Sequence, residues 1–178
     1  PVTEALSLSG VRLISRNLRA VYGNSGNRQA ALDLITGSAM GGLAFNNTGC
    51  GNMHCIGRHV GPQFHVNHGM SIAIVMPSVA KFNFPSQMEK YRSLAEAMDL
   101  DTHGARLADI GKIVVDGLRK LIGDVGITMK MSDLNPSRED LEKIAQDSYK
   151  QYQKFYYYRN PVKMTFKDYM MILEDCCK

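Results

Sequence analysis

The chain has 178 residues, of which 44% are hydrophobic and 21% are charged, as is ordinary for a globular protein with a sizeable core. Its net charge of +4 is small and its basic residues are dispersed, which argues against a nucleic-acid-binding surface. No apolar run approaches the roughly 18 residues of a membrane-spanning helix, so no membrane partner is expected.

Helical signals run along the whole chain, and no convincing alternating strand pattern appears. We therefore expect an all-α, multi-helix bundle in which residues 1–178 form a single domain. Thr3, Ser137 and Thr165 are expected N-caps, because their side chains can accept hydrogen bonds from the free amides of a first helical turn. Pro77 is expected to kink or end the third helix. The expected helices cover about residues 3–22, 27–46, 70–82, 85–98, 107–122, 138–152 and 166–175.

The later part of the second expected helix, residues 37–44, is dense in glycine and other small residues. A glycine inside a helix costs roughly 1 kcal/mol relative to alanine, so a run of them indicates close packing against the backbone. A neighbouring helix and a bound cofactor or substrate are both partners that would explain the run.

Two histidines, His54 and His68, stand fourteen residues apart in a stretch rich in glycine and histidine. Neutral imidazole is the commonest metal ligand in proteins. Fourteen residues of unbroken helix would span about 21 Å, whereas two ligands of one ion must approach within roughly 3–4 Å. The chain must therefore turn between them if both bind one metal, and Gly61-Pro62 is the predicted turn.

Other residues of this stretch have simpler explanations. His59 and His65, taken alone, are more typical of surface or hydrogen-bonded histidines. Cys50 lies four residues before His54 and could join it in a zinc site, although no CxxC pair supports this. The four cysteines lack the spacing of a disulfide framework, which favours reduced thiols in a cytoplasmic protein.

The chain contains, at fixed spacing, Gly41-Gly42-Leu43-Ala44-Phe45-Asn46-Asn47, Gly51, His54 and His68-Gly69. Together these residues resemble the signature of the iron-containing alcohol dehydrogenases. Asn160-Pro161, followed by Thr165 and Asp168, resembles the C-terminal segment of that family. The resemblance covers nearly the whole chain, and it implies the all-helical C-terminal fold that these enzymes share with dehydroquinate synthase-like proteins.

The resemblance implies that His54 and His68 are two of four protein ligands of a divalent metal, usually iron. In the family, the other two are an Asp and a His on a helix that precedes the segment where this chain starts. The nucleotide-binding domain for NAD or NADP precedes it too. Because the first residue is Pro1, with no initiator Met, we expect the chain to be the C-terminal, metal-binding fragment of a two-domain enzyme.

The resemblance also assigns residues near the cofactor. Arg58 stands where the family commonly has a histidine near the nicotinamide, and it offers a fixed positive charge instead of a proton. Either His59 then takes over proton transfer, or the proton follows another path. The alternative for Arg58 is an ordinary surface residue. Phe45 would line the space between cofactor and substrate. Tyr156 stands where the family often has a cysteine and could narrow the substrate pocket, although packing between the last helices is the more ordinary role for its ring.

The predicted function is therefore the oxidation of a small alcohol, or reduction of an aldehyde, by a metal-dependent enzyme that uses NAD or NADP. The fragment alone is expected to catalyse little, since it lacks half of the ligands. A homo-oligomer is possible. The alternatives are a zinc-using relative of the glycerol dehydrogenases, a zinc-stabilised domain that uses Cys50, His54 and His68, and a metal-free helical interaction domain.

Overall fold

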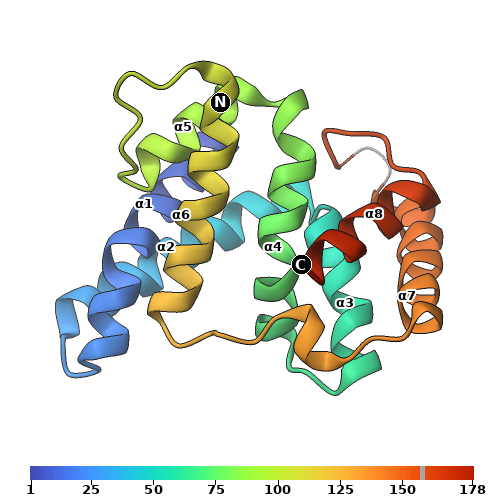
Figure 1. Cartoon of the computed structure of the whole chain (residues 1–178). Coiled ribbons are helices and arrows are strands. Elements are labelled where there is room, and N and C mark those ends of the chain that lie inside the picture. The colour runs from blue at the N-terminus through green and yellow to red at the C-terminus, as the bar shows by residue number, and fades with distance from the viewer. Residues whose placement is uncertain (157–158) are drawn as a thin grey trace. The chain divides into compact units, whose positions relative to one another are not determined.

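The computed structural model of the chain describes residues 1–156 and 159–178, and those residues form helices and connecting turns without a strand (Figure 1). The side chains of residues 155 and 156 lie outside this description. The predicted all-α fold is confirmed. The described α-helices are α1 (Val2–Gly23), α2 (Arg28–Thr48), α3 (Asn52–Phe64), α4 (His68–Asn83), α5 (Met88–Ala97), α6 (Ile110–Asp124), α7 (Arg138–Gln151) and α8 (Phe166–Cys176).

Short helical turns connect some of these helices. Three are 3-10 turns, and a π-helical turn, Tyr152–Tyr156, directly follows α7. Among the described helices, none is both long and apolar enough to cross a membrane. The 3-10 turns are Phe84–Ser86, Leu107–Asp109 and Met131–Leu134.

The helices form two compact units, and each is discontinuous in sequence. The first unit contains residues 1–49 and 87–126, and therefore α1, α2, α5 and α6. The second contains residues 50–86 and 127–178, and therefore α3, α4, α7 and α8. The single domain expected from the sequence stays a prediction, and the two units are described separately below.

In the first unit, α1 and α2 cross where each helix has a glycine. A Cβ atom added to Gly10 would lie 2.8 Å from the carbonyl oxygen of Gly37, and one added to Gly37 would lie 3.0 Å from that of Gly10. Real Cβ atoms essentially never approach other atoms so closely, so the two backbones need glycine here. A neighbouring helix therefore explains the start of the glycine run, whereas Gly41 and Gly42 face open space among the described residues.

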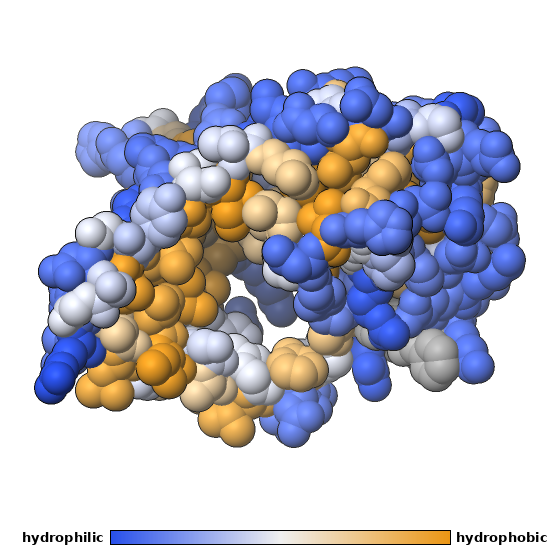
Figure 2. Space-filling model, turned by 90° about the horizontal axis from the view of Figure 1, so that it is seen from below, coloured by the Kyte–Doolittle hydropathy of each residue, from blue (hydrophilic) through white to orange (hydrophobic). Residues whose placement is uncertain are grey.

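One side of α2 remains exposed to solvent. Leu32, Ile35, Leu43 and Phe45 keep between 52% and 67% of their surface. Hydrophobic side chains also gather on the face of the molecule that Figure 2 presents. No other described part of the first unit packs over these apolar side chains, so α2 presents an apolar surface.

The second unit has an aromatic and aliphatic core to which all four of its helices contribute. Tyr152 and Tyr169 are completely buried in it, beside Ile56 of α3 and Val75 of α4. The rings of Tyr152 and Tyr169 meet edge to face, with centroids 6.2 Å apart. Such pairs add roughly 0.5–1.5 kcal/mol beyond the burial of their area, so the rings help to fix α8 against the rest of the unit.

Two of the three predicted N-caps are confirmed. The side chains of Ser137 and Thr165 each accept a hydrogen bond from a backbone amide of the first helical turn. In turn, the carboxylates of Asp140 and Asp168 accept a hydrogen bond from the backbone amide of the cap residue. Thr3 was a wrong prediction, because α1 already begins at Val2. A helix that starts beside the chain end has no preceding turn to favour one residue as its cap.

The turn predicted at Gly61-Pro62 and the helix end predicted at Pro77 were wrong, whereas the kink at Pro77 stays a prediction. Pro62 lies inside α3 and Pro77 lies inside α4, and both helices continue beyond them. Gly61-Pro62 therefore does not form the turn between the two histidines. A proline costs about 3 kcal/mol inside a helix, so tertiary packing must hold both segments helical.

Replacing Gly10 with alanine should lower the free energy of unfolding by about 1–3 kcal/mol, because the new methyl group would push α1 away from α2. Urea unfolding followed by circular dichroism measures the change. Gly41→Ala is the matched control on α2, where nothing lies within 4 Å of the added atom. That variant should be neutral or gain up to about 1 kcal/mol, and equal losses in both variants would contradict the close crossing.

Candidate metal centre

His54 and His68 each lie in the first turn of a helix. His54 is the third residue of α3, and His68 is the first residue of α4. Asn67 caps α4, because its side chain accepts a hydrogen bond from the amide of Met70. The N-terminal turns of α3 and α4 therefore define the position of both imidazoles.

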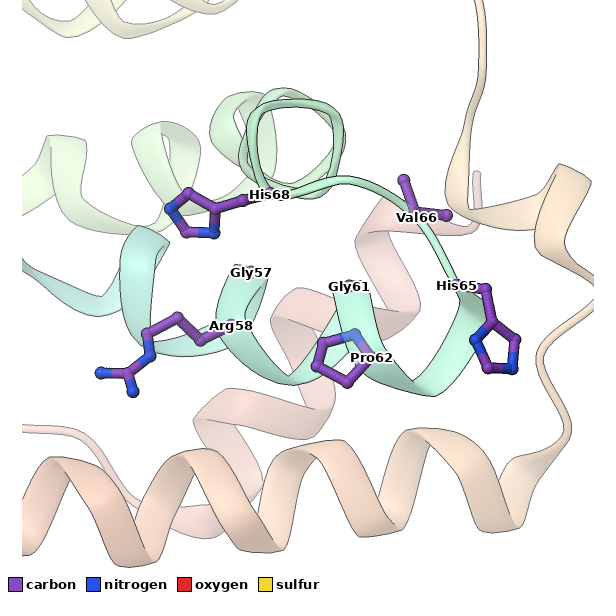
Figure 3. A pocket seen from close by; sticks show the side chains of 7 residues that line it. All are labelled: Gly57, Arg58, Gly61, Pro62, His65, Val66 and His68. Atoms are coloured by element: carbon purple, nitrogen blue, oxygen red, sulfur yellow. The ribbon is translucent and has the colours of Figure 1, made fainter.

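The chain doubles back between these two turns. α3 ends at His65, which adopts the left-handed conformation with φ 54°, and the amide of Val66 bonds to the carbonyl of Gly61 at 2.9 Å. The next residues run back over α3 and bring His68 above Gly57 (Figure 3). Eleven helical residues from His54 to His65 rise about 16 Å, and the three-residue return recovers roughly 10 Å.

The side chains close the remaining distance. The ring centroids of His54 and His68 lie 4.6 Å apart, with an angle of 69° between the ring planes. The prediction that the chain turns to bring the two histidines together is therefore confirmed, although the turn lies at residues 65–67 instead of Gly61-Pro62.

Glycines on α3 make the close return possible. A Cβ atom on Gly57 would lie 2.5 Å from Cδ1 of Ile72, and one on Gly61 would lie 3.0 Å from the carbonyl oxygen of Val66. The absence of side chains at these two positions thus lets α4 and its preceding turn lie against α3. Packing between segments of the chain explains both glycines without a bound ligand.

The donor set fits part of a transition-metal site. The pKa of His54 is lowered by burial, by His68 and by Arg58, in that order, which favours the neutral imidazole that binds metal. Two imidazoles suit iron or zinc but fill only half of a four-ligand site. Within residues 1–156 and 159–178, no three histidine, cysteine or acidic side chains come together, so the described part offers a half-site.

The alternative three-ligand zinc site is not formed. Cys50 does not join His54 and His68 in a group of ligands among the described residues. Cys55 is completely buried, its Sγ donates to the carbonyl of Ser148 at 3.2 Å, and burial raises the pKa of its thiol to about 11. A buried protonated thiol of this kind packs the core and is a poor metal ligand.

A buried hydrogen bond holds the first turn of α3. The hydroxyl of Tyr169, on α8, donates to Oδ1 of Asn52 at 2.7 Å. Both side chains are at least 99% buried, so this bond forms away from water. Because Asn52 comes two residues before His54, the bond links the position of the histidine to α8. Sequence analysis did not foresee it, since nothing local connects residues 117 positions apart.

The other predicted site residues lie in different surroundings. Arg58 is exposed on the same side of α3 as His54, one helical turn further on. His59 is turned about 140° away from His54, and its Nε2 lies 2.8 Å from Oε1 of Gln151 on α7. Phe45 belongs to the first unit and is 52% exposed. The side chain of Tyr156 lies outside the described residues.

The chain was also compared with known families and proteins. The model of the "Fe-containing alcohol dehydrogenase family, C-terminal" matches residues 1–177. The chain belongs to this family. The 1,3-propanediol dehydrogenase of Citrobacter freundii is 31% identical over 146 residues, which are 82% of this chain and 38% of that protein. Long-chain-alcohol dehydrogenase 1 of Geobacillus thermodenitrificans (strain NG80-2) is 29% identical over 98% of this chain and 44% of that protein.

Solved structures agree with this family assignment. A crystal structure of 1,3-propanediol oxidoreductase covers 99% of this chain with a TM-score of 0.92 and 28% identity, and the match is 45% of that chain. An alcohol dehydrogenase from Oenococcus oeni gives the same TM-score with 26% identity. The fold is that of the family's C-terminal domain, and the chain spans less than half the length of the relatives it matches.

The Tyr169–Asn52 bond can be tested with a double-mutant cycle. Tyr169→Phe and Asn52→Leu should each lower the free energy of unfolding by about 1–3 kcal/mol, because each leaves a buried polar group without its partner. The double variant should lose less than the sum of the single losses, by about 0.5–3 kcal/mol. Urea unfolding measures all four proteins, and strictly additive losses would show that the bond contributes nothing.

Proposed function

We propose that this chain is the metal-binding half of an NAD- or NADP-dependent alcohol dehydrogenase. The observation that carries the proposal is the approach of His54 and His68 to 4.6 Å in a chain of this family. Two imidazoles from separate helices converge, while the described residues supply no third ligand. That arrangement suits a site that a second domain completes.

His54 and His68 would hold the divalent metal, with Fe²⁺ the first candidate and Zn²⁺ the second. When bound, such an ion supplies a Lewis acid that lowers the pKa of an alcohol oxygen. The chain's own part is to present two imidazoles in a fixed geometry, with the first turn of α3 anchored by the bond between Asn52 and Tyr169. The other two ligands, an Asp and a His, would come from a helix that precedes this segment, and NAD or NADP would bind to a nucleotide-binding domain that precedes it too.

Arg58, Phe45 and Tyr156 remain the proposed residues on the side of the cofactor and substrate. Arg58 would present a fixed positive charge beside the histidine pair. Proton transfer by His59 also stays a prediction. Its bond to Gln151 holds it on the side of α3 that faces α7, so the ring would have to exchange that partner to act.

The substrate is proposed to be a small alcohol or aldehyde. Similar proteins are named for quite different substrates, among them a lactaldehyde reductase of Escherichia coli and a sulfoacetaldehyde reductase of Bilophila wadsworthia. Family membership therefore supports the proposed type of reaction more than it supports any one substrate. A cytoplasmic location and a homo-oligomeric assembly complete the proposal.

Metal binding by the isolated chain tests the ligand assignment. Titration with Zn²⁺ or anaerobic Fe²⁺ should show one weak site per chain, and His54→Ala or His68→Ala should weaken it by at least roughly 10–100-fold. Calorimetry and elemental analysis measure affinity and stoichiometry. His103→Ala is the control, because His103 lies in the first unit. Equal binding by the wild type and all three variants would remove both histidines from the site.

Turnover tests the proposed reaction. The native polypeptide, expressed with any sequence that precedes Pro1 in its gene, should oxidise small alcohols with NAD or NADP once loaded with Fe²⁺ or Zn²⁺. Its His68→Ala variant should lose at least about 100-fold in kcat/KM. Residues 1–178 alone should show no cofactor-dependent turnover, and activity from them would contradict the need for a second domain.

A further inference from the structure

We propose that the cavity beside the histidine pair binds an anionic group of the substrate on Arg58, so that this enzyme acts on alcohols or aldehydes that carry an acid group. The inference rests on the proposed function, because it names the substrate class of the same site. It is carried by the lining of the cavity, by the state of the Arg58 side chain and by the two helix ends that meet there.

The cavity lies along α3 and has a volume of about 390 Å³, which is large enough for a small organic acid. Arg58 and His68 lie at one end of it and His65 at the other, with Pro62 between them (Figure 3). No aspartate or glutamate is found among the described residues that line it. The lining residues are Gly57, Arg58, Gly61, Pro62, His65, Val66 and His68.

Arg58 differs from most arginines of the chain. Within the described part of the chain, its guanidinium has neither an ion pair nor a hydrogen bond, whereas six others pair with carboxylates. A guanidinium keeps its charge and can form two parallel hydrogen bonds to a carboxylate, sulfonate or phosphate. The group is therefore charged, solvated and available to a ligand. The paired arginines are Arg16, Arg19, Arg92, Arg106, Arg119 and Arg138.

Helix ends add to the positive field at this end of the cavity. α4 begins at His68, which lines the cavity, and the first turn of α3 reaches this end through His54, whose ring lies beside that of His68; neither helix has an acidic residue in its first turn. The N-terminus of a helix carries a partial positive charge of about half an elementary charge. By contrast, the first turns of α7 and α8 contain the acidic residues Asp140 and Asp168. The positive ends at the histidine pair are thus left for an external anion.

The spacing on α3 indicates where the acid group would lie. Arg58 follows His54 by four residues, so the two side chains start roughly 6 Å apart on one face of the helix. A reacting hydroxyl near the imidazoles and an acid group on Arg58 would then be separated by a few carbon atoms. A short hydroxy acid with the two groups at opposite ends fits this spacing.

A phosphate of the nucleotide cofactor is the competing source of negative charge. Both sources would use the same guanidinium chemistry, so the experiment has to separate them. The probes are 4-hydroxybutyrate, its uncharged counterpart 1,4-butanediol, and NAD or NADP, each titrated into residues 1–178 in the presence of EDTA. Amide shifts in nuclear magnetic resonance spectra report binding without turnover or metal.

We expect 4-hydroxybutyrate to give saturable shifts around Arg58 and His68, and 1,4-butanediol to give none. Arg58→Gln should lower the affinity for 4-hydroxybutyrate by about tenfold or more, and Arg58→Lys should lower it less. Arg28→Gln, in the first unit, should leave that affinity unchanged. Circular dichroism checks that each variant is folded. Absence of saturable shifts, or equal affinity in Arg58→Gln, would overturn the proposal. Shifts at Arg58 caused only by NAD or NADP would reassign the charge to the cofactor.

Kinetics of the native polypeptide give a second reading. The ratio of kcat/KM for 4-hydroxybutyrate over 1,4-butanediol should fall about tenfold or more in Arg58→Gln, because any effect on the nucleotide is common to both substrates and cancels in the ratio. An unchanged ratio, while the diol is still oxidised, would defeat the acid-group inference and leave the proposed function intact. Loss of all alcohol oxidation in the wild type would instead defeat the proposed function, and the binding experiment would still decide the role of Arg58.

Discussion

The return of the chain over α3 is the constraint on which the candidate metal centre depends. His54 lies in the first turn of α3 and the chain turns only after the last residue of that helix, Phe64, so the two rings could meet only if the next segment ran straight back along α3. Gly57 and Gly61 permit that path, because a side chain at either position would collide with Ile72 or with the carbonyl of Val66. The same two glycines therefore allow both the close packing of α4 against α3 and the approach of the two imidazoles.

The core of the second unit keeps this arrangement in place. Tyr169 donates to Asn52 from α8, and the hydroxyl of Tyr152 accepts a hydrogen bond from the amide of Met164. Both tyrosines are completely buried, so each polar tip needs a partner and each ring fills the centre of the unit. These buried contacts support the segment that carries the two candidate ligands, so their geometry does not depend on further ligands from outside the chain.

Local signals predicted the all-α fold and several helix ends correctly. Ser137 and Thr165 were predictable because a cap and its acidic partner lie within four residues. The turn predicted at Pro62 was wrong because the free-energy cost of a proline inside a helix can be read from the local sequence. The packing that outweighs this cost comes from residues elsewhere in the second unit. The spacing of His54 and His68 indicated that the chain turns, but not where. The hydrogen bond between Tyr169 and Asn52 could not be predicted from the sequence, because the two residues are 117 positions apart.

That separation also has a consequence for biosynthesis. At about 5–20 residues per second, a ribosome needs roughly 6–23 s to pass from Asn52 to Tyr169. During that interval α3 and α4 can pair with each other, but their apolar sides lack the buried tyrosines that later cover them. The nascent chain therefore spends many seconds with uncovered apolar surface near its two histidines, and α8 can fix the first turn of α3 only after that interval.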